Sequence, residues 1–396
     1  MENERIFLGD ISVINTKKVP GTVMLKHEFI VPDHYKKFTC KGGECRNTCC
    51  SGWKVTISRQ QYFVLHGLSC NKSLRDKMDR TFKPLVDPTP ERYAEIVHNY
   101  EGNCPLLLDN GLCQLHGSCG EEVLPWICRY YPRGPRIDYA FEATVANSCE
   151  RTLELLFETN NPIRFEIKEL TFKMQVKDSK PKQEEKDFYK KVQQFCFGLV
   201  QDRSIPLHDR IRKVGNILKA LDNHREQDLD KIDLTLDKIE PDFGQAYHVL
   251  LNVSEWFIEN SPSLSEYCST IKEMYDNHDN EAVYRKNLNH FESVIKDSEI
   301  KFEKMLINNM FFRQFPFFES TRNFTETYIS LVGTYVFVRY IAINLMHDKN
   351  TVDDFIDIMS KTFRVITHTR FENNIIALLQ AERATDTFIL AKLLNI

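Results

Sequence analysis

Glycine is scarce outside the first third of the sequence, and no Gly-x-Gly-x-Gly turn occurs anywhere in it. A turn of that kind follows the first strand of Rossmann-type folds and holds the cofactor there. Its absence argues against a Rossmann-type cofactor site. Only four of the fifteen glycines follow Gly134, which favours long helices in the rest of the chain.

A strong charge of one sign is also missing. The formal net charge is −4 over 396 residues, so no general electrostatic argument favours nucleic acid as a partner. The first residues, MENERIFLGD, are charged and precede no apolar run, so no secretory signal is expected. The most apolar segment, Tyr328–Met346, contains Arg339 and Asn344 and is expected to be a buried helix rather than a membrane span. We therefore expect a cytoplasmic protein that binds neither nucleic acid nor a membrane.

Cysteine, by contrast, is abundant and unevenly placed. Ten of the twelve cysteines precede residue 150, and only Cys196 and Cys268 follow it. In a reducing compartment, thiols at short spacings indicate metal binding rather than disulfides. Eight of them are candidate metal ligands: Cys40, Cys45, Cys49, Cys50, Cys104, Cys113, Cys128 and Cys149.

The first four candidates lie within eleven residues of the segment FTCKGGECRNTCCSGWKV (38–55) and end in the adjacent pair Cys49 and Cys50. Structural zinc sites usually take their ligands from two separated Cys-x2-4-Cys knuckles, which this segment lacks. Adjacent side chains are also expected to diverge, which disfavours ligation of one small ion. An iron–sulfur cube spreads its ligands further apart, so the pair favours a cluster, or separate roles for the two thiols.

The remaining cysteines are expected to be ordinary buried residues. Cys70, Cys196 and Cys268 stand alone in the sequence, and a lone cysteine usually packs as a small hydrophobic side chain. Cys119 is ambiguous, because Cys113-x2-His116-x2-Cys119 has the spacing of a ligand arm, although His116 by itself is expected at the surface.

The pattern along the chain predicts an α+β protein, with an irregular cysteine-rich metal-binding N-terminal domain followed by a mostly α-helical C-terminal domain. We expect a leader over residues 1–24, a cysteine-rich iron–sulfur domain over residues 25–175 and a helical, substrate-binding domain over residues 176–396. The boundary is placed in Met174–Lys186, which is charged, contains Pro181 and lacks a core pattern.

Local patterns predict individual elements. Short strands bounded by glycine and proline are expected at Lys54–Ile57, Tyr93–Val97 and Tyr139–Val145, a helix at Ser73–Phe82, and a half-buried strand where Ile163, Phe165 and Ile167 alternate with charged residues. In the C-terminal part, Phe188, Val192, Phe195 and Leu199 form a helical stripe. Thr351 and Asp354 indicate a capping box before another apolar helix face.

Three segments together resemble the flagellin lysine N-methylase family, part of a wider group of cysteine-cluster proteins described as zinc- or iron-chelating. They are CKGGECRNTCCSGWKVTI (40–57), NCPLLLDNGLCQLHGSCGEEVLPWICRYYPR (103–133) and NSCE (147–150). They keep the family's order of a Cys-Cys pair with Gly-Trp-Lys, a Cys-Pro, a Gly-Leu-Cys, a cysteine before Pro-Arg and a final cysteine. Farther on, INNMFFRQFPF (307–317) resembles the family's Asn-rich aromatic segment. Residues 1–24, Cys70 and Cys119 have no counterpart in the family pattern.

This resemblance implies an S-adenosylmethionine-dependent methyltransferase that carries a [4Fe–4S] cluster and methylates lysine side chains of flagellin. Methylation needs a neutral amine, whereas a free lysine is protonated at pH 7. Because the glycine-rich turn is absent, we expect the cluster to organise the reaction, with one iron open to the amino-acid end of the donor. No catalytic base can be singled out.

Other residues near the cysteines have two interpretations each. Trp53, Trp126, Tyr130 and Tyr131 either bind a cation by their ring faces or simply pack around the cluster. Arg129 and Arg133 either clamp the carboxylate of the donor or form surface ion pairs.

The residues alone also leave a second function open, a non-enzymatic module that holds zinc or iron for structure, storage or partner docking. An electron-transfer ferredoxin is disfavoured, because the chain is far longer than that role requires. The oligomeric state is not indicated.

Overall fold

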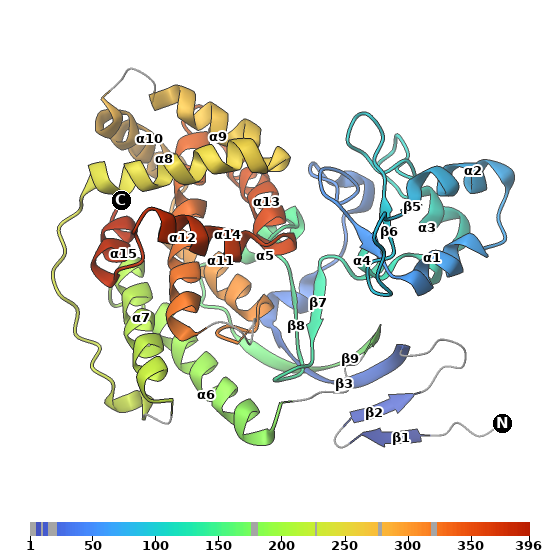
Figure 1. Cartoon of the computed structure of the whole chain (residues 1–396), viewed down its shortest axis with the longest axis horizontal. Helices are drawn as coiled ribbons and strands as arrows, with labels where there is room; N and C mark the ends of the chain where they lie inside the picture. Colours follow the sequence, from blue (N-terminus) through green and yellow to red (C-terminus); the bar gives the residue numbers. More distant parts are fainter. Residues whose placement is uncertain are drawn as a thin grey trace.

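The computed structural model describes residues 5–8, 11–14, 22–175, 181–225, 228–275, 279–317 and 323–396. Figure 1 shows a large helical domain on one side, a smaller lobe on the other, and a sheet that lies between and below them. The expected mixture of α and β structure, with a helical C-terminal region, is confirmed.

The central sheet is built on β3, whose partner β9 runs antiparallel along its whole length, from Thr22 opposite Gln175 to Pro32 opposite Phe165. At one end β3 also pairs with the hairpin β1–β2, and at the other with β8 and then β7. Among the described strands only β3 and β8 pair in parallel, so the sheet is not of the Rossmann type. The strands are β1 (Arg5–Leu8), β2 (Ile11–Ile14), β3 (Thr22–Pro32), β7 (Arg133–Arg136), β8 (Glu142–Val145) and β9 (Phe165–Gln175).

Alternation along β3 supplies the core under this sheet. Leu25, Phe29 and Val31 are fully buried and pack with Phe172 of β9 and Val145 of β8. These side chains meet on one face because successive residues of a strand point to opposite faces.

Residues 40–131 form the smaller lobe, here called the cysteine lobe (Figure 1, right). Its apolar cluster includes Val55, Leu74, Met78 and Leu115, and the thiols of several cysteines pack against that cluster. Its elements are η2 (Gly42–Glu44), β4 (Thr56–Ile57), α1 (Arg59–His66), α2 (Lys72–Thr81), β5 (Phe82–Pro84), β6 (Ala94–Ile96), α3 (Gln114–Cys119), η3 (Glu121–Val123) and α4 (Trp126–Tyr130).

The helical domain surrounds α12, whose side chains are buried almost throughout. By length and composition α12 could cross a membrane, but 94% of its most apolar window lies inside the protein, as expected for a core helix. The helices are α6 (Gln183–Val200), α7 (Leu207–Asn223), η4 (Leu229–Lys231), α8 (Phe243–Asn260), α9 (Pro262–Tyr275), α10 (Asn280–Val294), α11 (Ser298–Phe312), α12 (Phe324–Leu345), α13 (Val352–His368), α14 (Phe371–Ala381) and α15 (Thr387–Leu394).

Most elements expected from local pattern are present. The predicted helix at Ser73–Phe82 is α2, the three short strands are β4, β6 and β8, and Thr351 forms the predicted capping box with Asp354 at the start of α13. The strand around Phe165 is β9, but its Ile167 is 67% exposed, so the predicted burial of that position is wrong.

The division into domains stays a prediction. Strands β1 and β2 lie within the segment expected to be a leader, and the expected boundary segment includes the end of β9, residues 176–180, which are outside the described residues, and the start of α6. One short helix, α5 (Glu150–Phe157), connects the parts, because its Leu153 and Leu156 belong to the core of the helical domain.

Candidate metal centre

Seven of the eight candidate cysteines line a single cavity of about 180 Å³ inside the cysteine lobe. Its walls come from the loop after β3, from the segment between β6 and α3, and from α4. The cysteines are Cys40, Cys45, Cys49, Cys50, Cys104, Cys113 and Cys128, and the other walls are mostly apolar. All twelve cysteines of the chain are free thiols. We call this space the cysteine cavity.

The eighth candidate, Cys149, lies just before α5 and does not line the cavity. Its thiol is nevertheless near enough to Cys40 and Cys45 for their charges to affect one another's pKa. Burial raises the pKa of Cys149, and the charge of Cys40 adds to the effect. Burial likewise raises the pKa of Cys45 to about 12, with contributions from Glu150, Cys149 and Cys40. All eight cysteines are therefore brought into one region, although 109 residues separate the first from the last.

The pKa values of three more cavity thiols are raised by burial. Burial raises the pKa of Cys104 to about 12, and burial also raises the pKa of Cys113 and of Cys128. Cys128 is exposed by surface area, yet protein surrounds it, because the surface it exposes lines the cavity. Buried thiolates that repel one another need a cation to remain ionised, and a bound metal supplies that charge.

The adjacent thiols of Cys49 and Cys50 affect each other's ionisation. A hydrogen bond between them raises the pKa of Cys49 and lowers the pKa of Cys50 to about 7. Thr48 and the charge of Arg364 also lower the pKa of Cys50. Both residues line the cavity, and the carbonyl of Cys50 accepts a hydrogen bond from the backbone N–H of Cys104 at 2.7 Å.

The structure does not show the metal-binding character that the sequence predicts for this part of the chain. Among the described residues, no group of three or more His, Cys, Asp or Glu side chains could hold a metal ion. The thiols instead surround a space larger than an ion. Thiolates are soft ligands that suit iron–sulfur centres, whose ligands are spread over a larger group.

Of the other cysteines and the histidines, only some line the cysteine cavity. Cys70 and Cys119 pack against the apolar cluster of the lobe and do not line the cavity, while Cys196 and Cys268 are fully buried in the helical domain. His116 lines the cavity together with His98, which the sequence gave no reason to select. The predicted ligand arm therefore places His116, but not Cys119, at the cavity.

Two of the aromatic candidates line the cavity, and the two arginines do not. Trp53 and Tyr131 line the cavity, whereas the hydroxyl of Tyr130 accepts a hydrogen bond from the backbone of Lys173 on β9. Arg129 forms a two-point ion pair with the exposed Glu122, with N···O distances of 2.6 and 2.7 Å. Arg133 lies over the ring of Phe38. Neither arginine lines the cavity, and the surface-pair interpretation of Arg129 is confirmed.

Beside the cavity, His368 at the end of α13 joins the helical domain to the cysteine lobe. Its ring lies 4.5 Å from that of Trp53, and its Nε2 lies 3.0 Å from the hydroxyl of Ser148. The hydroxyl of Tyr131 donates to the carbonyl of Ser148 at 2.7 Å. Burial, and then the charges of three arginines, lower the pKa of His368 to about 3. The ring is therefore neutral at pH 7, with one ring nitrogen protonated and the other free of a proton.

A buried carboxylate fixes the loop that carries the first cysteines. Glu150, at the start of α5, is fully buried and accepts hydrogen bonds from the backbone N–H groups of Arg46 and Asn47 at 3.1 and 2.6 Å. Lys41 pairs with the same carboxylate at 2.7 Å and with Glu154 at 2.8 Å. Arg46 reaches α13 and pairs with Asp357 at 2.9 Å. These contacts hold the Cys40–Cys45 loop against Cys149.

The Asn-rich segment 307–317 supports the last cysteine from the other side. Asn308 of α11 donates to the carbonyl of Val145 at 2.8 Å and to the side chain of Asn147 at 2.7 Å, and it accepts from Thr144 at 2.7 Å. Asn147 in turn donates to the carbonyl of Met305 at 2.8 Å. The segment thus fixes the turn that leads into Cys149.

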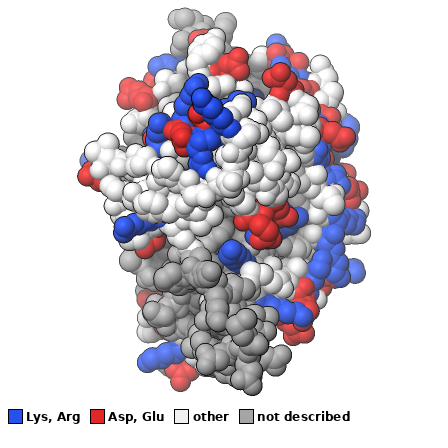
Figure 2. Space-filling model, turned by 90° about the vertical axis from the view of Figure 1, so that its right-hand side faces the viewer, with Lys and Arg blue, Asp and Glu red and all other residues white. Residues whose placement is uncertain are grey.

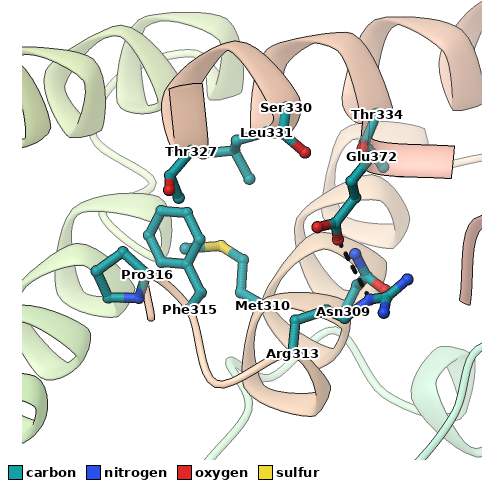
Figure 3. A pocket seen from close by; sticks show the side chains of 10 residues that line it. All are labelled: Asn309, Met310, Arg313, Phe315, Pro316, Thr327, Ser330, Leu331, Thr334 and Glu372. Atoms are coloured by element: carbon teal, nitrogen blue, oxygen red, sulfur yellow. Dashed lines mark ion pairs between the residues drawn. The ribbon is translucent and has the colours of Figure 1, made fainter. Parts of the chain in front are cut away.

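The same segment also forms one wall of a small cavity in the helical domain (Figure 3). Figure 3 shows Arg313 and Glu372 facing each other on one side, 3.2 Å apart, and Phe315, Pro316 and Thr327 on the other. The cavity measures about 30 Å³, which is room for one or two water molecules. It is therefore too small for a nucleoside-containing donor.

The outer face of the cysteine lobe carries charges of both signs. Figure 2, which looks onto this side, shows Lys and Arg groups interspersed with Asp and Glu, and most of the face belongs to other residues. Among the described residues on this face, no single-sign surface of the kind that attracts a polyanion is visible.

With this geometry in place, comparison with known proteins decides the family. Residues 193–393 match the FliB lysine N-methylase C-terminal domain, which is half of the chain. The chain belongs to the FliB lysine N-methylase family. The expected lysine N-methylase family is thereby confirmed. The match lies in the helical part of the chain and contains none of the eight candidate cysteines.

Curated relatives agree with this family assignment. The lysine-N-methylases of Salmonella typhimurium and Salmonella choleraesuis are each 26% identical over 159 residues, which is 38% of this chain and 37% of each relative. The flagellar biosynthetic protein FliU of Salmonella muenchen is 26% identical over 121 residues, 30% of this chain and 67% of that protein. The matched part thus spans little more than a third of the two lysine-N-methylases. No solved structure matches the chain.

Proposed function

We propose that this protein is an S-adenosylmethionine-dependent protein lysine N-methyltransferase that acts on flagellin and carries a [4Fe–4S] cluster in the cysteine cavity. The observation that carries the proposal is the gathering of seven candidate cysteines around one cavity in a chain whose helical domain belongs to the FliB family. The names of the relatives, lysine-N-methylase and flagellar biosynthetic protein, support the reaction and a flagellar substrate.

The thiols of Cys40, Cys45, Cys49, Cys50, Cys104, Cys113, Cys128 and Cys149 are the residues available to hold iron. A bound cluster with one iron free of protein ligands would supply an attachment point for the amino-acid end of the donor. The volume of about 180 Å³ beside these thiols supports a donor site at the cysteine cavity. The described sheet is not of the Rossmann type, and the cavity next to Arg313 is too small.

The protein side of the site offers an apolar, aromatic surrounding. Trp53 and Tyr131 line the cavity, and ring faces of this kind attract sulfonium and ammonium groups. An apolar surrounding also favours the neutral form of a lysine amine, which is the form that accepts a methyl group. His368 does not serve as the proton acceptor in this proposal, because burial and nearby arginines keep its pKa near 3.

A cytoplasmic location is consistent with the proposed function. Twelve free thiols fit a reducing compartment, and the long apolar helix α12 lies inside the protein. We therefore propose a cytoplasmic protein that modifies flagellin before export, without contact with nucleic acid or membrane.

The decisive experiment is the intact mass of flagellin co-expressed with this protein. We expect added mass in steps of one methyl group, and loss of that mass with Cys50→Ala or Cys104→Ala. The matched control is Cys119→Ala, a cysteine of the same lobe that does not line the cavity, which should retain methylation. If flagellin stays unmodified when the wild-type protein is loaded with iron and supplied with donor, the proposed methyltransferase activity is refuted.

The alternative is a non-enzymatic metal-binding module, because one candidate thiol belongs to the apolar cluster of the lobe and two others pack against that cluster. Cys50, Cys104 and Cys113 pack with Val55, Leu106 and Leu115. A metal there would stabilise the lobe whether or not it takes part in chemistry. Titration of the iron-loaded protein with S-adenosylmethionine separates the two. A change in the visible spectrum supports the enzyme, and an unchanged spectrum supports a structural role.

A further inference from the structure

Exposed apolar side chains gather on the cysteine lobe. Within the described residues, seven of the ten large hydrophobic side chains that are exposed belong to this lobe. Four of them lie on two successive loops, residues 97–103 and residues 107–112, here called the rim loops. They are Val97, Tyr100, Leu108 and Leu112, and Tyr100 is fully exposed. Apolar side chains that gather at a surface in this way typically mark a site of interaction with another molecule.

Main-chain contacts fix both rim loops to the segment of the first cysteines. In the first loop, Asn103 forms a β-bridge with Ser51. In the second, the N–H of Leu108 donates to the carbonyl of Leu112 at 2.9 Å, and the turn between them packs against the backbone of Gly43. Both loops are thus anchored next to the candidate thiols.

The rim loops also form part of the wall of the cysteine cavity, through His98, Gly111 and Leu112. Leu112 is 49% exposed, so the wall of the cavity reaches the surface at this loop. Tyr100 and Leu108 do not line the cavity and lie on the same loops outside it. A molecule that contacts these two side chains therefore lies beside the mouth of the cavity.

The charge of the rim loops has one sign. Residues 93–128 contain five acidic residues and no Lys or Arg, and this segment supplies more than half of the residues that line the cavity. Two of the five acids pair with Arg129. Glu101 and Asp109, one on each rim loop, are exposed and form no ion pair within the described residues. The mouth of the cavity therefore attracts a cationic partner.

The acidic mouth decides between the possible occupants of this surface. A nucleic acid would be repelled. A second copy of this chain, docked by twofold symmetry, would set the same acidic loops against each other, which is also unfavourable. A polypeptide with a lysine between apolar residues fits both properties, because its ammonium group complements the carboxylates and its apolar neighbours complement the exposed side chains.

We propose that the rim loops are the docking surface for the protein substrate, which binds through a segment that carries a lysine flanked by apolar residues. Tyr100 and Leu108 pack against the apolar neighbours of that lysine. Glu101 and Asp109 attract its ammonium group, and the lysine side chain enters the cavity past Leu112. The proposal rests on the proposed methylation of flagellin and adds which part of the substrate is recognised and by which residues.

The test is the affinity of the full-length protein for fluorescently labelled, purified flagellin, measured beside methylation kinetics. One double variant, Tyr100→Ser with Leu108→Ser, removes the apolar contacts, and another, Glu101→Gln with Asp109→Asn, removes the charges. We expect each to raise the Kd and the KM for flagellin about tenfold. The kcat, the KM of the donor and the melting temperature should change little, because none of the four side chains lines the cavity.

The matched control is Val86→Ser with Glu91→Gln, which replaces an exposed apolar and an exposed acidic residue of the same lobe outside the rim loops. It should bind flagellin as the wild type does. Salt gives a readout that a folding defect would not produce. Rising ionic strength should weaken binding by the wild type and by the apolar variant, and should affect the variant without the two carboxylates much less.

Wild-type affinity in both rim variants, or no binding of flagellin by the wild type, would overturn the proposal. A dimer in sedimentation experiments that both rim variants abolish would assign the loops to a second copy of the chain and would overturn it as well. Binding that depends on the rim loops but is followed by no methylation would refute the methyltransferase alone and leave the docking surface in place.

Discussion

The guanidinium of Arg364, on helix α13, donates a hydrogen bond to the backbone carbonyl of Ser51 at 3.2 Å, across 313 residues of sequence. A second hydrogen bond from the same side chain goes to the carbonyl of Asn47. Arg364 is only 7% exposed, so the helical domain holds the loop of Cys49 and Cys50 from both sides of the pair with a buried charge.

Replacement of this arginine should loosen the cysteine loop. We expect Arg364→Ala to lower the free energy of unfolding by roughly 2–4 kcal/mol, because two charge-assisted hydrogen bonds to part-buried carbonyls are lost. Iron retention after reconstitution should fall as well. Chemical denaturation and iron content measure the two effects. Arg370→Ala, an exposed arginine that lies between α13 and α14, serves as the control and should change neither. Equal stability of both variants would contradict the assigned role of Arg364.

Close backbone contact between Gly43 and the turn at Asn110 brings the loop of the first cysteines to the segment of Cys113. A Cβ atom on Gly43 would lie 2.2 Å from the carbonyl oxygen of Asn110. Gly43→Ala should therefore separate the two segments, destabilise the protein by about 1–3 kcal/mol and reduce iron content. Gly117→Ala is the matched control, because nothing lies within 4 Å of its Cβ position and alanine suits a helix. Thermal melts and iron analysis compare the pair, and wild-type iron content in Gly43→Ala would refute this contact's role.

The buried carboxylate of Glu150 predicts acid sensitivity. Burial opposes its ionisation, but Lys41 and the backbone N–H groups of Asn47 and Arg46 outweigh burial and lower its pKa below 4.5. A lowered folded pKa means that the stabilisation is present above pH 4.5 and is lost as the pH falls through the folded value. Urea unfolding of the metal-free protein should show this loss, and Glu150→Gln should be less stable than the wild type by roughly 1–3 kcal/mol at pH 7. A variant as stable as the wild type at pH 7 would contradict the prediction.

A second buried carboxylate predicts the opposite pH dependence. Glu142 on β8 is 1% exposed, accepts a hydrogen bond from the hydroxyl of Tyr189 at 2.6 Å, and burial raises its pKa to about 7. Its stabilising contribution is complete below pH 4.5, the ordinary value, and is lost as the pH rises to about 7.

Glu142→Gln imitates the protonated form and should remove this loss. The variant should gain about 3 kcal/mol over the wild type between pH 4.5 and pH 8, measured by urea unfolding at each pH. Glu91→Gln, at an exposed position, should follow the wild type. A constant difference between wild type and Glu142→Gln over this range would show that Glu142 is already ionised in the folded protein.

Much of the secondary structure could be predicted, because its causes are local. Thr351 and Asp354 are three residues apart, and their capping box forms as the sequence indicates. The apolar stripe of α13 is buried as expected. His368 lies one turn further along the same face, so extending the stripe by one turn would have selected it. Strand β9 was harder, because partners far along the chain decide which of its faces is covered, and Ile167 remains exposed.

The thiols of the candidate site could be predicted from the sequence, but the residues that hold the cysteine loops in place could not. The thiols are evident from composition and spacing, and seven of the eight selected do line one cavity, although their role as ligands stays a prediction. Arg364, Glu150 and Asn308, which hold the cysteine loops, carry no local signal, since each acts on a segment between 103 and 317 residues away.

The sequence by itself determined that the chain has clustered thiols in front and long apolar helices behind, because spacing and periodicity act over a few residues. Only the tertiary structure decided which thiols are neighbours. Cys50 lies with Cys104, Cys113 and Cys128, and Cys45 lies with Cys149, because backbone hydrogen bonds and the buried Glu150 fold distant loops onto one another. Metal ligation depends on where sulfur atoms lie in space, and those positions are fixed by contacts between residues far apart in the chain.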